Sequence, residues 1–292
     1  MNGCMLCPRQ CGVDRTVVAG FCRSGTLPTV ARAALHFHEE PCISGERGSG
    51  AVFFTGCNLR CIYCQNVQIS RGNCGTVVTP ERLREIYFEL IAQGAHTINL
   101  VTATQFADTV ALSLTGGLPV PVVYNCGGYE SVRMLRMLEG KVQIYMPDFK
   151  YSDPALAARY SAAPDYPAVA EAALLEMVRQ TGGWQADDDG ILRRGVLIRH
   201  LVLPGALENT FGVIDRVRAL FPRPGQVLFS LMRQFTPVVP LPQYPDLNRA
   251  LTDSEYEQAE QYLFDSGIED GFVQEADSAD ACYIPAFDGT GI

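Results

Sequence analysis

The sequence predicts an α/β protein, a partial (β/α)6 TIM-like barrel preceded by an irregular cysteine-rich module. Short apolar runs of strand length alternate with longer amphipathic stretches of helical period. The runs are too apolar to face water on either side, which is typical of a parallel sheet covered by helices. We expect the strands at residues 51–55, 97–102, 120–125, 142–146, 196–202 and 226–231.

Two of the helices between these strands have readable ends. Thr79 followed by Pro80 predicts an N-cap with proline at the first helical position, and Gly94 is suited to end that helix. Thr252 and Glu255 form a capping box ahead of the last helix. Because strands and helices alternate along the chain, we expect active groups at the carboxyl ends of the strands.

Composition divides the chain into two parts. Residues 1–45 are rich in Cys, Gly and Pro, which predicts a metal-binding module that cannot build its own core, and residues 46–292 are the predicted barrel. The net charge of −9 argues against nucleic acid or an anionic membrane as a partner. No apolar run approaches the roughly 18 residues of a membrane span, and the opening MNGCMLCPRQ is not typical of a signal peptide. We expect a cytoplasmic protein.

Eleven cysteines is a high count for a cytoplasmic protein. Disulfides would be the usual explanation in a secreted protein, but nothing in the sequence directs export. Seven of the cysteines lie in two groups at short spacings, and reduced thiols in such groups indicate metal binding.

The first group is Cys57, Cys61 and Cys64, in the loop that follows the first predicted strand. Three thiolates on one tight loop can hold three irons of a [4Fe–4S] cluster and leave the fourth iron open. The open iron can chelate the amino and carboxylate groups of S-adenosylmethionine (SAM), and an electron from the cluster can then release a 5′-deoxyadenosyl radical. The alternative is a zinc site or incidental thiols, although zinc requires a fourth ligand.

Polar residues at other strand ends agree with a SAM site. Asn125 ends the third predicted strand, and Asp148 and Lys150 follow the fourth. Because these two charged residues are two positions apart, they share a side if the chain is extended. A carboxylate beside an ammonium suits a zwitterionic ligand that carries hydroxyl groups. A surface ion pair is the alternative.

The cysteine spacing, with Tyr63 before the third cysteine, resembles the radical SAM superfamily signature. In that family the aromatic residue lies against the adenine. The chain also resembles the pyruvate formate-lyase activating enzymes, and more closely a branch of similar proteins whose substrates are mostly unassigned. This resemblance implies that Asp148 and Lys150, as the D-x-K motif, Asn125 and Arg199 contact SAM.

Two segments depart from the activating enzymes. Their Gly-Gly-Glu motif after the second strand, which meets the SAM amino group, is replaced here by residues 102–106. Their histidine near the sixth strand is replaced by Met232-Arg233-Gln234, which leaves Gln234 as a weak candidate for SAM binding. A glycyl radical substrate therefore does not follow from the resemblance.

The second group is Cys4, Cys7, Cys11 and Cys22. Four thiolates in a segment short of core residues can close a tetrahedral zinc site or hold a second, fully ligated iron–sulfur cluster. A structural or electron-relay role is favoured over direct substrate contact. The spacing does not choose between zinc and iron–sulfur.

Three further features bear on catalysis. Cys126 is a weak catalytic candidate, because a thiol at a strand end could donate or relay a hydrogen atom. The segment from His36 to Glu40 could form a substrate-facing patch or a solvated edge. If Arg199 faces the barrel interior, His200 points outward towards a helix.

These observations predict a radical SAM enzyme that abstracts hydrogen from a substrate. One version activates a glycyl radical protein, and another modifies a small molecule or a peptide. The electron would come from a reductant such as flavodoxin or ferredoxin. The alternative from another class is a non-catalytic iron–sulfur protein that senses redox state.

Overall fold

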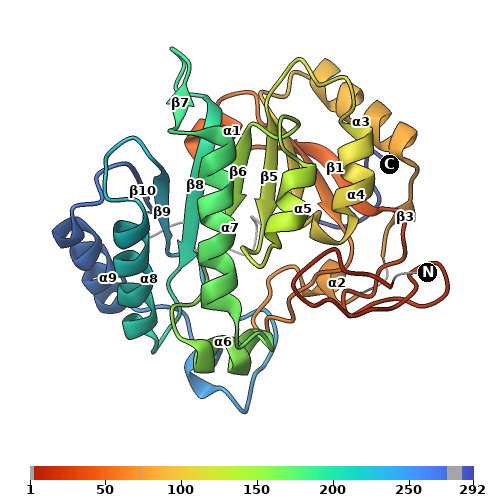
Figure 1. Ribbon diagram of the computed structural model, residues 1–292. Helices are drawn as coiled ribbons and strands as arrows, with labels where there is room; N and C mark the ends of the chain where they lie inside the picture. The colour runs from red at the N-terminus through yellow and green to blue at the C-terminus, as the bar shows by residue number, and fades with distance from the viewer. Residues whose placement is uncertain (1–2, 73, 275–284) are drawn as a thin grey trace.

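The structure is a computed structural model that describes residues 3–72, 74–274 and 285–292. Its centre is a ten-stranded sheet in the order β10-β9-β8-β6-β5-β4-β2-β1-β3, with β7 paired to β8 (Figure 1). The strands that run parallel to their neighbours are β2 (Ser49–Phe54), β4 (Ile98–Val101), β5 (Val122–Cys126), β6 (Ile144–Pro147), β8 (Leu192–Leu201), β9 (Leu228–Met232) and β10 (Gly271–Val273).

Three pairings are antiparallel. β1 (Thr29–His36) pairs with β2, β3 (Thr76–Val77) pairs with β1, and β7 (Gln185–Ala186) pairs with β8. The predicted α/β class is confirmed, and each of the six expected strands has a counterpart in the sheet. The sheet is not closed, so the partial TIM-like barrel is not confirmed: β10 and β3 lie at its two ends.

The helices cover the sheet and connect its strands. None of the helices within the described residues is long and apolar enough to cross a membrane. Their bounds are α1 (Pro41–Ser44), α2 (Val67–Ser70), α3 (Pro80–Ala92), α4 (Ala107–Ser113), α5 (Val132–Met137), α6 (Pro154–Ser161), α7 (Tyr166–Thr181), α8 (Leu207–Leu220) and α9 (Asp253–Ser266), with 3-10 turns at Thr104–Phe106 and Pro245–Asn248.

The two faces of the sheet carry different cores. Alternate residues of each strand point to opposite faces. On β4, Ile98 and Leu100 join the large core built with the long helices, whereas Val101 belongs to a smaller cluster on the opposite face. On that opposite face α1 contributes Cys42 and Ile43 to a further apolar cluster.

The predicted helix ends are confirmed. The Thr79 side chain accepts a hydrogen bond from the Arg82 N–H at the start of α3. Thr252 and Glu255 form the capping box of α9, which ends at Gly267 in a left-handed conformation.

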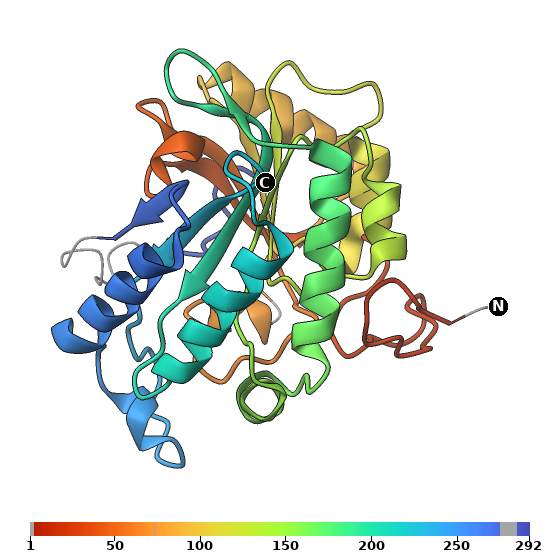
Figure 2. The same ribbon diagram turned by 60° about the vertical axis from the view of Figure 1, so that its left-hand side comes forward.

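The N-terminal segment has two kinds of structure. Residues 3–28 contain no helix or strand, and their loops, red in Figures 1 and 2, extend from one end of the molecule. Residues 29–36 form β1, because buried Val30, Ala31 and Ala33 pack into the sheet beside β2. The division into parts at residue 45 stays a prediction.

Candidate functional site

A cavity of about 220 Å³ lies where the parallel strands end. It brings together residues that are far apart in the sequence, from the loop after β2 and from the ends of β5, β6, β8 and β9. The predicted site residues that line it are Cys57, Cys61, Tyr63, Cys64, Asn125, Cys126, Asp148, Lys150, Arg199 and Gln234.

The loop that carries the three cysteines is held at its first turn. Gly56 has a φ of +88°, and a Cβ atom there would lie 2.6 Å from the Cys22 carbonyl oxygen, so only glycine fits. The Gln105 side-chain amide donates to the carbonyl oxygens of Gly56 at 3.0 Å and Thr102 at 2.8 Å. At the position of the activating enzymes' Gly-Gly-Glu motif, this chain therefore has the buried Gln105, whose hydrogen bonds stabilise the start of the cysteine loop.

Each of the three sulfur atoms accepts a hydrogen bond. The Leu59 N–H donates to Cys57 Sγ at 3.4 Å, the Ser161 hydroxyl to Cys61 Sγ at 3.0 Å, and the Ser70 hydroxyl to Cys64 Sγ at 3.4 Å. Hydrogen bonds to sulfur are a common feature of iron–sulfur ligands.

The thiols need a metal to become thiolates. Burial, reinforced by the charge of Cys61, raises the pKa of Cys57 and of Cys64 above the ordinary range for cysteine. A bound metal centre would deprotonate both, because coordination favours the thiolate. The donor set of three hydrogen-bonded sulfurs that line one cavity, buried at Cys61 and half-buried at Cys57 and Cys64, therefore fits a cluster.

Neither cysteine group is arranged around one metal ion. Among the residues with described positions, no three His, Cys, Asp or Glu side chains have that arrangement. Cysteines that bind a cluster coordinate different irons, so their sulfurs need not converge on one point as zinc ligands must.

A buried charged group lies beside the sulfurs. Lys150 Nζ is 2.5 Å from Asp148 Oδ2, and Arg199 Nε is 3.2 Å from Asp148 Oδ1. Burial alone would raise the pKa of Asp148, but Lys150 and Arg199 lower it below its usual value. Burial alone would lower the pKa of Lys150, but Asp148 raises it. The carboxylate and both cations are therefore charged at neutral pH.

Glu39 is a member of this group that the sequence did not assign. Its carboxylate accepts from Arg199 Nη1 at 2.9 Å and from Asn125 Nδ2 at 3.2 Å, while Arg199 Nη2 donates to Asn125 Oδ1 at 2.9 Å. Glu40 follows, with Oε2 3.7 Å from Arg199 Nη1, and burial raises its pKa. The adjacent acids Glu39 and Glu40 were the sequence feature that could have indicated this role. Their position beside Arg199 of β8 depends on the pairing of β1 with β2, which the sequence pattern did not predict.

The predicted adenine contact is held by aromatic and hydroxyl neighbours. The Tyr63 hydroxyl is 2.7 Å from that of Tyr151, which is 2.7 Å from the Ser161 hydroxyl. The Tyr63 ring lies 6.1 Å from the ring of Phe235. Tyr63 is therefore connected to the Cys61 sulfur through two hydroxyl groups.

Cys126 lines the cavity and lies next to the buried Glu130. Burial, followed by the charge of Glu130, raises the pKa of Cys126 well above its ordinary value. Burial raises the pKa of Glu130 to about 8, and that carboxyl accepts from Thr104 Oγ1 at 2.7 Å and from the Tyr124 hydroxyl at 3.3 Å. Cys126 is therefore a protonated thiol at neutral pH.

The histidines take two different positions. His36 and His38 line the cavity together with Glu39, with ring centroids 5.8 Å apart. Burial and the neighbouring cations lower the pKa of His36 to about 4. His200 points away from the cavity as predicted, with ring nitrogens 2.7 Å from the Phe149 carbonyl oxygen and 2.9 Å from Thr210 Oγ1 on α8.

The four N-terminal cysteines lie near one another but do not line the cavity. Cys4 lowers the pKa of Cys11, and burial, reinforced by Cys22 and Cys4, raises the pKa of Cys7, so these side chains are close enough to interact. A Cβ atom on Gly20 would lie 3.0 Å from Cys11 Sγ and 3.8 Å from Cys22 Sγ. Cys11 and Cys22 therefore both lie close to Gly20.

Arg9 connects this segment to the cysteine loop. Its guanidinium donates to the carbonyl oxygens of Asn58 at 2.8 Å, Ser161 at 3.2 Å and Ala162. Asn58 follows Cys57, and the Ser161 hydroxyl binds the Cys61 sulfur. The two cysteine groups are therefore joined through one side chain.

The family comparison supports the cluster. Residues 43–123 match a protein family described as a 4Fe-4S single cluster domain, and this region contains Cys57, Cys61 and Cys64. The chain is therefore an α/β protein in which residues 43–123 are similar to an iron–sulfur domain.

One relative and two solved structures are similar to most of this chain. An uncharacterized protein of Methanocaldococcus jannaschii, MJ0674, is 26% identical over 272 residues, covering 88% of this chain and 73% of the relative. SuiB of Streptococcus suis bound to precursor peptide SuiA has a TM-score of 0.51 at 8% identity, covering 76% of this chain and 47% of SuiB. SuiB bound to S-adenosylmethionine has a TM-score of 0.48 at 9% identity, covering 76% and 49%. The chain spans about half the length of these solved structures, and the likeness at 0.51 concerns the fold.

Proposed function

We propose that this protein is a radical SAM enzyme. A cluster on Cys57, Cys61 and Cys64 would supply the electron that cleaves SAM to a 5′-deoxyadenosyl radical, which abstracts hydrogen from a substrate. The observation that carries the proposal is that the three thiols share one cavity with the buried charged group of Asp148, Lys150 and Arg199. The 4Fe-4S match and the fold support the radical SAM superfamily.

The charged group suits the polar part of SAM. Lys150 donates one hydrogen bond to Asp148, which leaves two of its three N–H groups for a carboxylate. Asp148 accepts from Lys150 and Arg199 and has remaining lone pairs for a hydroxyl or an ammonium. Tyr63 and Phe235 supply an apolar wall on which an adenine ring can stack.

Glu39 acts here as a positioning residue. It holds both Arg199 and Asn125, so it fixes two of the proposed SAM contacts at once. The Arg199 side chain is only 13% exposed and is surrounded by carboxylates, which keep its charge in place without water.

The walls of the cavity protect a reactive radical. Phe53, Phe54 and Met232 line the cavity and exclude water from it. Cys126 is our catalytic candidate, because its protonated thiol carries a hydrogen atom that it could donate or relay.

The substrate would meet the wall of His36, His38 and Glu39, which face the same cavity. Hydrogen abstraction is the common step of glycyl radical activation and of small-molecule or peptide modification. SuiB, a structure of similar fold, was solved with the precursor peptide SuiA, which favours a peptide among these substrates. Glycyl radical activation is the second candidate, supported by the D-x-K motif at Asp148 and Lys150.

The N-terminal cysteines would hold a second metal centre, either zinc or an iron–sulfur cluster. Their segment has no helix or strand over residues 3–28, so a bound metal would contribute much of its folding free energy. Its role would be structural or that of an electron relay.

The experiment is an anaerobic assay for 5′-deoxyadenosine. The protein is reconstituted with iron and sulfide and mixed with dithionite and SAM. We expect product from the parent protein and from Cys42→Ala, whose thiol lies outside the cavity, but none from Cys57→Ala, Cys61→Ala or Cys64→Ala. A well-loaded cluster that makes no 5′-deoxyadenosine would contradict the enzyme and favour a redox-sensing protein.

A further inference from the structure

A second cavity lies on the other side of the cysteine loop. Its volume is about 300 Å³, and the residues that line it are Phe21, Arg23, Cys57, Arg60, Ser70 and Arg71. Cys57 lines both this cavity and the one at the strand ends. Ser70, which binds the Cys64 sulfur, also lines both, so two residues at the proposed cluster border this part of the surface.

This part of the surface is basic in an acidic protein. Residues 3–25 and 57–72 together contain five arginines, one aspartate and no other charged residue, whereas the chain has a net charge of −9. The aspartate, Asp14, binds the N–H and hydroxyl of Thr16. Across the described ranges, the ion pairs with carboxylates do not include any of these five arginines, which are Arg9, Arg15, Arg23, Arg60 and Arg71.

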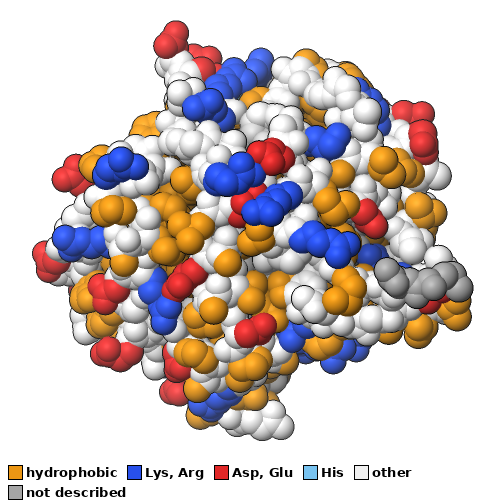
Figure 3. Space-filling model, in the orientation of Figure 1, with side chains coloured by type: hydrophobic (Ala, Val, Ile, Leu, Met, Phe, Trp, Pro, Cys, Tyr) orange, Lys and Arg blue, Asp and Glu red, His pale blue; other side chains and the backbone are white. Residues whose placement is uncertain are grey.

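The guanidinium groups are held in place by neutral partners. Phe21 lies between Arg60, 3.9 Å from its ring centroid, and Arg9, at 4.1 Å. Arg71 donates to the Cys61 carbonyl oxygen at 2.7 Å, and Arg23 donates to the Arg71 carbonyl oxygen. Because these contacts orient the side chains without neutralising them, the positive charge remains available to a partner. Figure 3 shows Lys and Arg side chains along the lower margin of the molecule, below the N-terminal loops.

We propose that this arginine surface, Arg23, Arg60 and Arg71 around Phe21, is the docking site of an acidic one-electron carrier protein of the flavodoxin or ferredoxin class. The inference rests on the proposed function, which requires one electron per SAM cleaved. The reduced carrier is oxidised by one electron, the cluster beside Cys57 is reduced by it, and no bond forms between the two proteins.

Charge favours this partner. An acidic carrier is attracted by the arginine surface and repelled by the rest of the chain, so approach is directed to the face nearest the cluster. Electron-transfer complexes are small and transient, which suits a patch of this size. RNA would also meet arginines, but the acidic remainder of the protein would repel a long polyanion.

The test measures binding without turnover. An oxidised acidic flavodoxin is titrated into the iron-loaded protein by calorimetry at about 50 mM and about 200 mM salt. We expect Arg23→Glu to raise the Kd about tenfold and added salt to weaken binding several-fold. The matched control is Arg218→Glu, the same change of charge on exposed α8 at the opposite side of the molecule, and it should leave the Kd unchanged.

Three results would overturn the docking site: no binding of the carrier, an equal loss in Arg23→Glu and Arg218→Glu, or tighter binding of a single-stranded RNA than of flavodoxin. A second readout separates this inference from the proposed function. In Arg23→Glu, SAM cleavage driven by reduced flavodoxin should fall about tenfold while cleavage driven by dithionite is retained. Absence of cleavage with dithionite in the parent protein would contradict the proposed function, whereas salt-dependent binding at Arg23 would still support the docking site.

Discussion

The two cysteine groups of this chain use the same side chain in different surroundings. Cys57, Cys61 and Cys64 lie on a loop anchored by β2, face a cavity and are bordered by buried charged residues. The N-terminal group lies in loops without helix or strand, and its neighbours are arginines and aromatic rings.

The difference is the basis for proposing chemistry at the first group and a structural or electron-relay role at the second. Ligands at the end of a parallel strand have a rigid support and polar neighbours that can bind a cosubstrate. Ligands in an irregular segment have neither, so a metal bound there would contribute mainly to folding. Arg9, from the N-terminal segment, connects the two groups. It donates to the carbonyl oxygen of Asn58, next to Cys57, and to that of Ser161, whose hydroxyl binds the Cys61 sulfur.

The largest expected difference between the two groups is in SAM cleavage. Cys61→Ser should reduce 5′-deoxyadenosine formation to background, because the cluster loses one of three ligands. Cys11→Ser should retain cleavage within a few-fold while lowering the midpoint of thermal unfolding. Both are measured on anaerobically reconstituted protein. Equal loss of cleavage in the two variants would show that the N-terminal group takes part in the reaction.

The buried charged group offers the next largest effect. Arg199→Met leaves Glu39 without its cation in a buried site and leaves Asp148 with Lys150 alone, which should lower the free energy of unfolding by about 3–5 kcal/mol.

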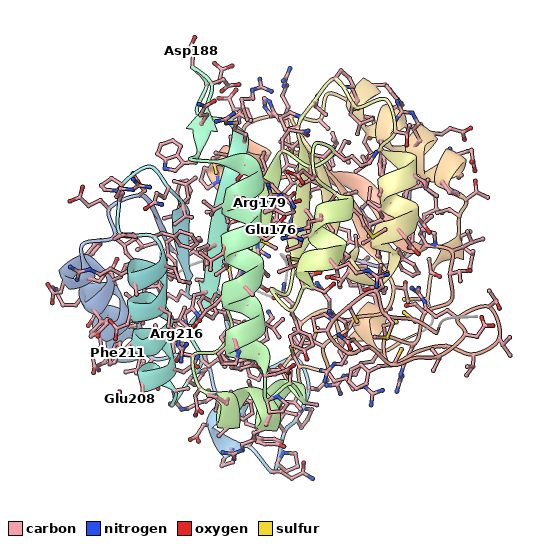
Figure 4. The ribbon with its side chains drawn as sticks, in the orientation of Figure 1. Glu176, Arg179, Asp188, Glu208, Phe211 and Arg216 are labelled. Atoms are coloured by element: carbon pink, nitrogen blue, oxygen red, sulfur yellow. The ribbon has the colours of Figure 1, made fainter. Side chains whose placement is uncertain are left out.

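A matched control lies on the opposite face of the sheet, where Arg179 pairs with Glu176 on α7 (Figure 4). The Arg179 side chain is 49% exposed, and Glu176, which is only 5% exposed, keeps Arg136 and Gln180 as partners, so Arg179→Met should cost only about 1 kcal/mol. Urea unfolding measures both variants, and similar losses would argue that burial does not distinguish the two ion pairs.

Much of the cavity wall could be predicted from the sequence because strand ends are local features. The cysteines from Cys57 to Cys64 follow one apolar run, and Asn125, Asp148 and Lys150 lie at or just after the ends of two others. Parallel strands bring such ends to one edge of the sheet, where these residues line the cavity. The side chains of Arg199 and His200 point to opposite faces of the sheet, as the alternation of residues along a strand predicts.

Other features depended on contacts between distant segments. Glu39 reaches Arg199 only because β1 pairs antiparallel with β2, and residues 29–36 carried no strong strand signal within a Cys-rich segment. Whether the sheet closes into a barrel depends on whether its two end strands pair with each other. The end strand β10 has only three residues, too few to show the alternation of a strand in the sequence. Arg9 lies 152 positions from Ser161, so no local pattern indicates their contact.

Acid should act on the strand-end region through His200. Burial lowers the pKa of His200 to about 4, below its ordinary value of 6.5. As the pH falls below 6.5 the unfolded chain binds a proton first, so stability that is complete above pH 6.5 is lost down to about pH 4, by about 3 kcal/mol. Unfolding free energies of the parent protein and of His200→Gln across this range measure the effect, and parallel pH profiles would exclude His200 as its source.

The smallest effect is expected at the connection between the two regions. Arg9→Gln removes the charged hydrogen bonds to Asn58 and Ser161, at a cost of about 1.5–3 kcal/mol. The loss of visible cluster absorption in air should then be a few-fold faster than in the parent protein. Arg218→Gln on exposed α8 is the control, and equal decay rates in Arg9→Gln and the parent would argue against the connection.

The most direct test of the central claim uses protein in which Cys4, Cys7, Cys11 and Cys22 are all replaced by Ala. Iron and sulfide are counted after anaerobic reconstitution, and the EPR spectrum of the reduced protein is recorded with and without SAM. We predict about four irons and four sulfides per chain and a spectrum that changes when SAM is added, because the remaining cluster has an open iron. A protein with no cluster, or with a cluster whose spectrum ignores SAM, would contradict the assignment of the SAM site to Cys57, Cys61 and Cys64.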